Sequence, residues 1–406
     1  MDGPRAQDQH LPALDGLRGI AILAVMLFHQ VTACGFGSDA WITRKIIGLC
    51  VPLWSGVDLF FVLSGFLITG ILVRAKDQPG YFKNFYMRRA LRIFPLYYGA
   101  LVVIFVVLPH FLDTSTPGVR RVYDAQPWLW AYSEDISILI HNEDFFDPDP
   151  LWIGHFWSLA VEEHFYLVWP LVVYLCRRRT LVVISLVLVG VTPVLRALML
   201  AAHFDMAVIY TQTFSRTDEL ALGGLVAVLV ERWSAERMLH WARWAIGVAI
   251  AVVVAAMVIQ GGPLWWGHWT ALVPGFSALA LGAAGLVVVA ISPGGGALRR
   301  LFEAPALRTL GKYSYGLYVL HVPLQPLYLR LFPPARLAAA AAGLGWSGSR
   351  LVGLLGFTAL ASLVTLALAM LSFHLYERPF LGLKRFFQYG QRRSLPARTR
   401  RAVQLS

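Results

Sequence analysis

Charged residues are scarce in this chain of 406 residues. They make up 14% of it, whereas 57% of the residues are hydrophobic and the mean hydropathy is +0.61. A soluble chain of this length would form two or three domains. Here apolar runs of roughly 20 residues, long enough to cross a bilayer, recur from end to end. The composition therefore excludes a string of soluble domains and predicts an all-α polytopic membrane protein.

Cysteine is also rare. The three cysteines are Cys34, Cys50 and Cys176, and no two of them form a CxxC pair. Three cysteines cannot build a disulfide scaffold, and without a CxxC pair nothing suggests a metal site. A single bridge between Cys34 and Cys50 stays open, since both could lie on one side of the membrane. We expect no metal.

The apolar runs and the Gly and Pro residues between them predict about ten spans. These are residues 16–34, 52–73, 91–110, 152–175, 180–202, 216–232, 240–260, 270–291, 314–332 and 351–375. The net charge of +12 does not indicate nucleic-acid binding, because the basic residues cluster between the runs, as in cytoplasmic loops.

Alternating the spans from a cytoplasmic N-terminus puts most of the 35 Lys and Arg residues inside and the acidic loop 111–150 outside. The positive-inside rule therefore predicts that both termini are cytoplasmic, with an even number of spans. We expect one membrane domain over residues 11–380 and a basic cytoplasmic tail over residues 381–406, with no soluble domain.

Ionisable residues inside spans are costly and usually face a cavity or a partner. In the first span, "LDGLRGIAILAVMLFHQ", Arg18 and His29 are 11 residues apart. At about 100° per residue they point in nearly the same direction, about 16 Å apart along the axis. Asp15 lies on a face near Arg18. The alternative is a snorkelling arginine and a structural histidine.

Further polar residues occur in or near the other spans. They are Asp58 and Ser64, the cluster Arg88, Arg89 and Arg92, the group His155, Glu162, Glu163 and His164, then His321 and Glu377. Arg88 and Arg92, at i and i+4, would form a clamp on one helix face suited to phosphate groups. Two adjacent carboxylates in lipid require partners, protonation or a wet cavity. Helix packing for Ser64 with Gly65, and helix-end anchoring for Glu377, are the simpler alternatives.

Six segments resemble, in order, the motif series of the bacterial acyltransferase-3 family. They are "LDGLRGIAILAVMLFH", "GVDLFFVLSGFLITGIL", "RRALRIFPLYY", "FWSLAVEEHFYLVWPL", "SYGLYVLHVP" and "ERP", and the match runs from about residue 11 to 380. Members of this family are integral membrane O-acyltransferases that modify surface glycans and macrolides.

The resemblance implies roles for individual residues. The family's Arg-x10-His signature falls on Arg18 and His29, with the histidine as the catalytic residue. The arginine-rich motif falls on Arg88, Arg89 and Arg92 and implies acyl-CoA handling. The Trp-Ser-Leu…Glu-Glu motif falls on Trp157, Ser158, Glu162 and Glu163. His164 stands where the family often has glutamine. Many relatives carry an additional soluble domain, and we expect none here.

Together these features predict an O-acyltransferase of the bacterial cytoplasmic membrane. Acyl-CoA, with acetyl-CoA expected, would be held by the arginines, and His29 would act as general base or become acylated. Glu162 or Glu163 would orient His29 or bind the acceptor, a hydroxyl of a surface glycan or, alternatively, of a macrolide. Arg18 would position CoA or stabilise charge.

A secondary transporter would also carry intramembrane charges, but we find no internal repeat of the kind that such proteins show. A non-catalytic membrane scaffold would have no use for the Arg-x10-His pair.

Overall fold

The computed structural model describes residues 11–34, 41–111, 116–141, 152–346 and 348–389, and every regular element in those ranges is helical. The longer helices are α1 (Pro12–Ala33), α3 (Gly56–Ala75), α4 (Tyr81–Val102), α8 (Trp157–Leu175), α9 (Arg178–Ala201), α11 (Thr217–Leu229), α12 (Ala235–Gln260), α13 (Phe276–Ile291) and α19 (Ser349–Ser372).

Shorter helices connect and cover these. They are α2 (Trp41–Cys50), α5 (Pro117–Asp124), α6 (Gln126–Trp130), α7 (Glu134–His141), α10 (Met206–Thr211), α14 (Gly296–Phe302), α15 (Pro305–Lys312), α16 (Ser314–His321), α17 (Gln325–Leu331), α18 (Pro334–Gly343) and α20 (Arg378–Gly382). Single 3-10 or π-helical turns lie at Val51–Ser55, Val103–Val107, Leu108–His110, Gly154–Phe156, Thr213–Ser215, Ala271–Gly275, Phe373–Glu377 and Leu383–Phe386.

Seven helical stretches of the described chain are long and apolar enough to cross a membrane. They are Pro12–Ala33, Trp41–Ala75, Tyr81–His110, Arg178–Ala201, Ala235–Gln260, Ala271–Ile291 and Ser349–Phe386. The three other expected spans are helical as well, but α11 has 13 residues and spans only about 20 Å. The segment 314–332 is divided between α16 and α17 near Pro323. An all-helical membrane fold is therefore supported, while ten spans and their orientation stay predictions.

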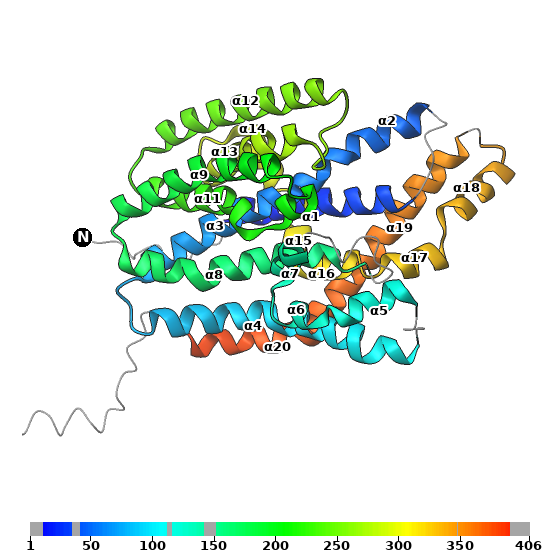
Figure 1. The fold of residues 1–406 in the computed structure, drawn as a ribbon, viewed down its shortest axis with the longest axis horizontal. Coiled ribbons are helices and arrows are strands. Elements are labelled where there is room, and N and C mark those ends of the chain that lie inside the picture. The colour runs from blue at the N-terminus through cyan, green and yellow to red at the C-terminus, as the bar shows by residue number, and fades with distance from the viewer. Residues whose placement is uncertain (1–10, 35–40, 112–115, 142–151, 347, 390–406) are drawn as a thin grey trace, which may run out of the picture.

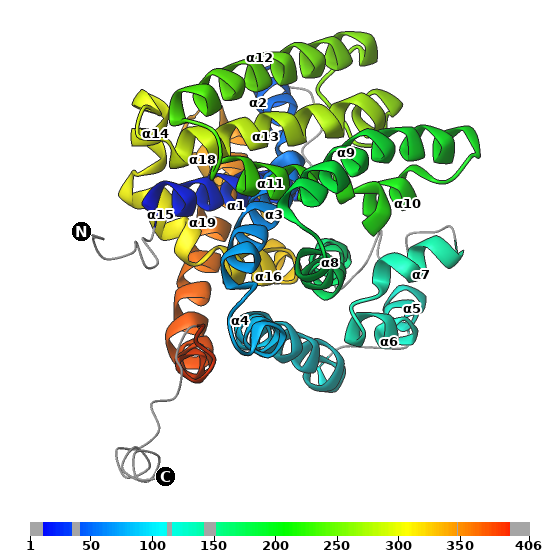
Figure 2. The ribbon, with the colours of Figure 1, turned by 90° about the vertical axis from the view of Figure 1, so that its left-hand side faces the viewer.

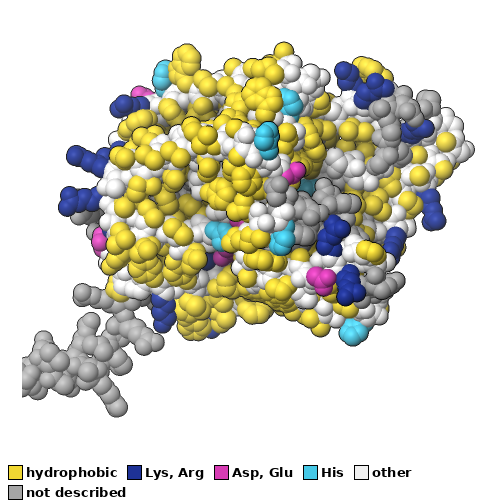
Figure 3. Space-filling model, in the orientation of Figure 1, with side chains coloured by type: hydrophobic (Ala, Val, Ile, Leu, Met, Phe, Trp, Pro, Cys, Tyr) yellow, Lys and Arg dark blue, Asp and Glu magenta, His cyan; other side chains and the backbone are white. Residues whose placement is uncertain are grey.

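The surface is also typical of a membrane protein. Hydrophobic side chains cover much of the face in Figure 3, and many of its Lys and Arg side chains lie toward the two ends. Large apolar residues are exposed on the outer faces of the long helices, among them Leu175, Trp244 and Leu363. A solvated surface of this kind would be costly, whereas lipid tails would cover it without penalty.

Helices α1 and α3 lie in the middle of the bundle. Figure 2 places α12 and α13 on one side of them and α4 on the other, and Figure 1 shows most long helices running roughly alongside one another. Helix α11 packs along α3, and α15 packs along α1. We call the end where α1 begins and α3 terminates the entry end, and the end where α1 terminates the far end.

Glycines let the central backbones touch. A Cβ atom at Gly16 or Gly19 of α1 would lie 1.7 Å from the Phe302 carbonyl oxygen or 2.0 Å from that of Leu307. A Cβ at Gly65 of α3 would lie 1.9 Å from the Leu220 oxygen. Such contacts are typical of small residues at membrane helix interfaces. The packing expected of Gly65 is therefore present.

Two buried arginines tie α3, α9, α11 and α13 together. Arg216 lies 3.1 Å from Asp58 and 3.2 Å from Glu219, and its guanidinium lies 4.1 Å from the centre of the Phe276 ring. Arg196 lies 2.8 Å from Asp218. Asp58, predicted as a supporting residue, is thus an ion-pair partner inside the fold.

Candidate active site

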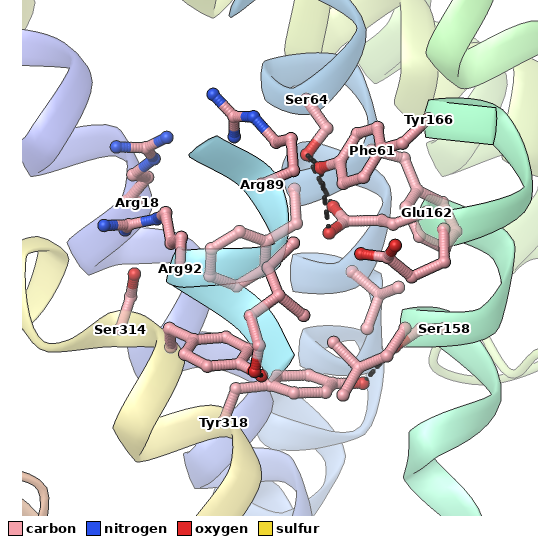
Figure 4. Close-up of a pocket in the computed structure, with 16 residues that line it drawn as sticks. Arg18, Phe61, Ser64, Arg89, Arg92, Ser158, Glu162, Tyr166, Ser314 and Tyr318 are labelled. Atoms are coloured by element: carbon pink, nitrogen blue, oxygen red, sulfur yellow. Dashed lines mark hydrogen bonds between the residues drawn. The ribbon is translucent and has the colours of Figure 1, made fainter. Parts of the chain in front are cut away.

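A narrow polar cavity, which we call the arginine pocket, lies between α1, α3, α4, α8 and α16 (Figure 4). Its volume is about 90 Å³. Its polar lining comprises Arg18, Arg89, Arg92, Ser64, Ser158, Glu162, Glu163, Tyr166, Ser314, Tyr315 and Tyr318. In Figure 4 the three guanidinium groups lie on one side, and Glu162 with Tyr166 on the other. Positive and negative groups from distant segments therefore face one cavity.

The pair of arginines that faces this pocket differs from the predicted one. Arg89 and Arg92 of α4 line it, together with Arg18 of α1. Arg88 points to the C-terminal segment instead, where it donates hydrogen bonds to the carbonyls of Lys384 and Phe387 at 3.5 and 3.4 Å. The clamp expected of Arg88 and Arg92 is therefore wrong. Residues i and i+4 do share a face, but the Arg88 side chain turns to backbone carbonyls beyond α20.

Arg18 keeps its expected neighbour, since its guanidinium lies 3.7 Å from the Asp15 carboxylate. Arg89 lies over the rings of Phe85 and Tyr166, at 6.0 and 5.9 Å. The described part of the chain places no carboxylate within 4 Å of Arg89 or Arg92. Two cations without an ion-pair partner at the edge of a polar cavity are suited to an anionic ligand.

The two glutamates have different surroundings. Glu162 accepts hydrogen bonds from Ser64 at 2.5 Å and from Tyr166 at 3.1 Å, whereas Oε1 of Glu163 has no partner within the described residues. His164 turns away and contacts Thr213 at 2.8 Å, because successive helical residues are about 100° apart. Ser64 therefore donates a hydrogen bond to Glu162, and it also lies next to Gly65, where α3 meets α11.

Three histidines meet toward the far end. Nε2 of His321 lies 3.3 Å from Nδ1 of His29, and the ring centres of His155 and His321 are 5.1 Å apart. His29 Nδ1 lies 2.9 Å from the Val25 carbonyl, and His321 Nδ1 lies 2.8 Å from that of Tyr318. A carbonyl only accepts, so both Nδ1 atoms carry the proton. In the neutral imidazole, Nε2 of His29 is therefore unprotonated and able to accept a proton.

The glutamates do not orient His29, contrary to one expectation. Both line the arginine pocket, while the ring of His29 is held by Val25 and His321. Arg18 and His29 lie about three helical turns apart, and neither glutamate lines the cavity that His29 lines.

His29 lines a second cavity of about 520 Å³, which we call the aromatic pocket. Its walls include Phe28, Trp54, Trp152, Trp157, Tyr210, Trp265 and Trp266. Val57 and Tyr318 line both this cavity and the arginine pocket. Tyr318 is hydrogen-bonded to Ser158 and donates to the carbonyl of His155 at 2.9 Å. The two cavities are thus neighbours separated by the side chains of Tyr318 and Val57.

Other predicted residues lie around these cavities. Trp157 lines the aromatic pocket, and Ser158 lines the arginine pocket. Glu377 accepts a hydrogen bond from Ser372 at 3.1 Å and lines neither pocket. Cys34 and Cys50 are both free thiols in the structure. Of the predicted tail, residues 390–406 lie outside the described residues.

Tyr318, Trp265 and Trp266 were missed as site residues. Trp265 and Trp266 lie in the connection after α12, and an aromatic pair there resembles an ordinary interfacial belt. In the sequence Tyr318 is one of three hydroxyl-bearing residues shortly before His321, and nothing distinguishes it from the other two. Arg196 was missed as well, although an arginine within an apolar run is a signal that sequence alone provides. Arg216 stands between the polar stretches TQTFS and TDE, where an arginine is not unusual.

The family model described as an acyltransferase domain matches residues 11–374. The chain belongs to the acyltransferase-3 family. Among curated relatives, the peptidoglycan O-acetyltransferase OatA of Listeria monocytogenes is 27% identical over 343 residues, which cover 79% of this chain and 50% of that protein.

Two further relatives have a similar extent of match to this acyltransferase-3 chain. The O-acetyltransferase OatA of Staphylococcus aureus is 27% identical over 78% of this chain and 51% of its own length. The putative peptidoglycan O-acetyltransferase YrhL of Bacillus subtilis is 29% identical over 78% and 48%. The chain thus spans about half the length of the curated relatives it matches. No solved structure matches it significantly.

Proposed function

We propose that this protein is an O-acyltransferase that moves an acyl group from cytoplasmic acyl-CoA to a hydroxyl of a cell-surface glycan. The observation that carries the proposal is that Arg18 and His29, on one helix, line two neighbouring cavities of opposite character. One cavity has cations for a phosphorylated donor, and the other has an unprotonated imidazole nitrogen beside room for an acceptor.

The donor binds from the entry end. Acyl-CoA carries phosphates, and guanidinium groups bind phosphate through charge-assisted, paired hydrogen bonds. Arg89 and Arg92 hold these phosphates, while Arg18 lines the same pocket and contacts the thioester arm or stabilises charge. The entry end then faces the cytoplasm, with both termini inside and the protein in the bacterial cytoplasmic membrane. The basic segments near this end support that orientation.

His29 carries the chemistry. Its Nε2 takes the proton from the acceptor hydroxyl as the oxygen attacks the thioester carbonyl. The tetrahedral intermediate then collapses, the C–S bond breaks, and the leaving thiolate takes the proton back from His29. An alternative sequence passes the acyl group through Nε2 of His29, and it requires the same free nitrogen. His321 keeps Nδ1 of His29 protonated and is a positioning residue.

The glutamates have a separate role. Glu162, held by Ser64 and Tyr166, faces the arginines across their pocket. A carboxylate there partly balances the three cations when no donor is bound, and it limits how tightly the product CoA is retained.

The acceptor class follows the relatives, whose names specify O-acetyltransferases and, for two of them, peptidoglycan. An acetyl donor is the corresponding choice.

The test uses the purified full-length protein in nanodiscs with radiolabelled acetyl-CoA and bacterial envelope glycan. Wild-type protein should place base-labile label on the glycan and release CoA. His29→Ala should abolish both while the protein still elutes as a single species. His240→Ala, at an exposed position on α12, is the control and should behave as wild type. Transfer at an undiminished rate in His29→Ala would refute the proposed mechanism, and a wild-type protein that transfers nothing would refute the function.

A further inference from the structure

We infer that the aromatic pocket is a binding site for one neutral pyranose ring of the acceptor, with Trp265 as the stacking platform. The inference rests on the proposed function and adds to it a subsite and the chemical class that this subsite accepts. It concerns the cavity on the other side of Tyr318 from the arginine pocket.

The walls of the pocket form a connected set of rings. Trp265 and Trp266 have ring centres 5.2 Å apart, and Trp266 stacks on Tyr210 at 4.9 Å. Tyr210 in turn meets Trp157 at 4.8 Å. Stacking on Tyr210 holds Trp266 in place, whereas Trp265 is 38% exposed and presents free ring surface. The C–H groups on one face of a pyranose carry partial positive charge and match the negative face of such a ring.

A close glycine supports the position of Trp265. A Cβ atom at Gly267 would lie 2.6 Å from the indole nitrogen of Trp265. Gln260 Oε1 also accepts a hydrogen bond from the Trp265 backbone at 3.4 Å. The indole therefore packs against the turn that carries it.

The described lining of the aromatic pocket is uncharged. It contains no Asp, Glu, Lys or Arg, whereas five charged groups line the arginine pocket. Besides the indole N–H groups and the tyrosine hydroxyls, its polar groups are His29, His155 and the hydroxyls of Thr32 and Thr211. Both hydroxyls donate to backbone carbonyls, at 2.8 and 2.9 Å, and so keep lone pairs for a ligand hydroxyl.

The volume and the location fit one ring placed for reaction. About 520 Å³ lies within the range of small-ligand sites. The rings of Phe28 and Trp265 are 6.3 Å apart, and those of Phe28 and His29 are 5.0 Å apart. Trp265 and His29 line the same cavity on either side of Phe28 in this chain of contacts, so a sugar stacked on Trp265 can direct a hydroxyl toward His29. A carboxylated sugar would bring an uncompensated charge into this neutral site at a considerable cost.

The experiment compares acceptors and variants in the nanodisc assay with acetyl-CoA. The probes are methyl β-D-glucopyranoside, its 2-acetamido analogue, and the matching methyl glucuronide as the charged counterpart. At least one neutral glycoside should accept acetyl groups or compete with envelope glycan, and the glucuronide should do neither. Trp265→Ala should raise the KM or inhibition constant of the neutral glycoside about tenfold, equivalent to about 1.4 kcal/mol, without moving the KM of acetyl-CoA.

Two further variants separate stacking from folding. Trp265→Phe retains a ring and should recover most of the affinity. Trp269→Ala removes a tryptophan four residues away that is 50% exposed and lines neither pocket, and it should leave all constants unchanged. The inference is overturned if the glucuronide is used as well as the neutral glycosides, if Trp265→Ala has no effect, or if wild-type protein acylates envelope glycan but ignores every glycoside. Absence of any transfer by wild-type protein would instead overturn the proposed function.

Discussion

Replacing the arginines of α4 one at a time provides a sharp test of the donor site. Arg89 and Arg92 line the arginine pocket, whereas Arg88 bonds two carbonyls near the C-terminus. We predict that Arg89→Ala or Arg92→Ala weakens acyl-CoA binding and that Arg88→Ala does not. The three residues lie within five positions of one helix, so each serves as a control for the others.

The magnitude follows from the bonds that are lost. A hydrogen bond to a charged group contributes about 1.5–3 kcal/mol, so removing one guanidinium should raise the dissociation constant of CoA roughly 10- to 150-fold. Arg88→Ala removes long bonds of 3.4–3.5 Å to backbone carbonyls, whose loss affects folding and not the CoA site. We expect its CoA affinity to stay within about twofold of wild type.

Calorimetric titration of CoA into nanodisc-embedded protein measures this directly, without relying on KM as a binding constant. Raising the ionic strength should weaken binding to wild-type protein more than to Arg89→Ala. Salt screens the attraction between each arginine and the phosphates, and wild type has one more such arginine than the variant. The reasoning would be refuted if Arg88→Ala lost as much affinity as Arg89→Ala, or if all three variants bound CoA as wild type does.

Three further predictions concern other parts of the molecule. His321→Ala should lower kcat about tenfold or more with little change in the KM of acetyl-CoA, because His29 loses the partner 3.3 Å from its Nδ1; steady-state kinetics measure both constants. Asp58→Ala should destabilise the fold by about 3 kcal/mol, the lower end for a broken buried pair, because Glu219 still lies 3.2 Å from Arg216; thermal unfolding in detergent measures this. Burial, with the nearby Asp135, raises the pKa of Glu134 in α7 well above its usual range. Stability should therefore fall as the pH rises above about 4.3, the usual pKa of glutamate, and Glu134→Gln should remove that loss, so its melting temperature should exceed that of wild type at pH 8 but not at pH 4.

Each of these has a contrary outcome. An unchanged kcat for His321→Ala would show that His29 needs no support from that ring. A melting temperature for Asp58→Ala equal to that of wild type would mean that Glu219 alone compensates Arg216. A stability difference for Glu134→Gln that is the same at pH 4 and pH 8 would exclude titration of this carboxyl as the cause.

Much of the fold follows from local patterns, and the site follows only in part. Long apolar runs predict helices, and an 11-residue spacing places Arg18 and His29 in one direction along α1. Which face of α4 turns inward depends on neighbouring helices, so Arg88 and Arg89 could not be separated from spacing alone. The contact of His29 with His321 joins residues 292 positions apart, and only the packing of α16 on α1 creates it.

The roles of the individual residues stay predictions, and the position of α8 illustrates why. The sequence predicts that Glu162 or Glu163 orients His29 or binds the acceptor, and the first of these requires a place beside His29. The structure instead separates them, because Glu162 lies near the entry side of Tyr318 and His29 beyond it. Sequence identifies which residues are unusual, whereas depth along the bundle determines which of them can act together.

The glycine contacts of α1 have a consequence for how far the acyl group travels. Gly16 and Gly19 touch the backbone oxygens of Phe302 and Leu307 so closely that α1 cannot slide or rotate without moving α14 and α15. Helix α1 therefore holds Arg18 and His29 about 16 Å apart, at fixed depths in the bundle. Under the proposed function the donor's own thioester arm has to span this distance, so transfer should depend on the length of the donor as well as on its charge.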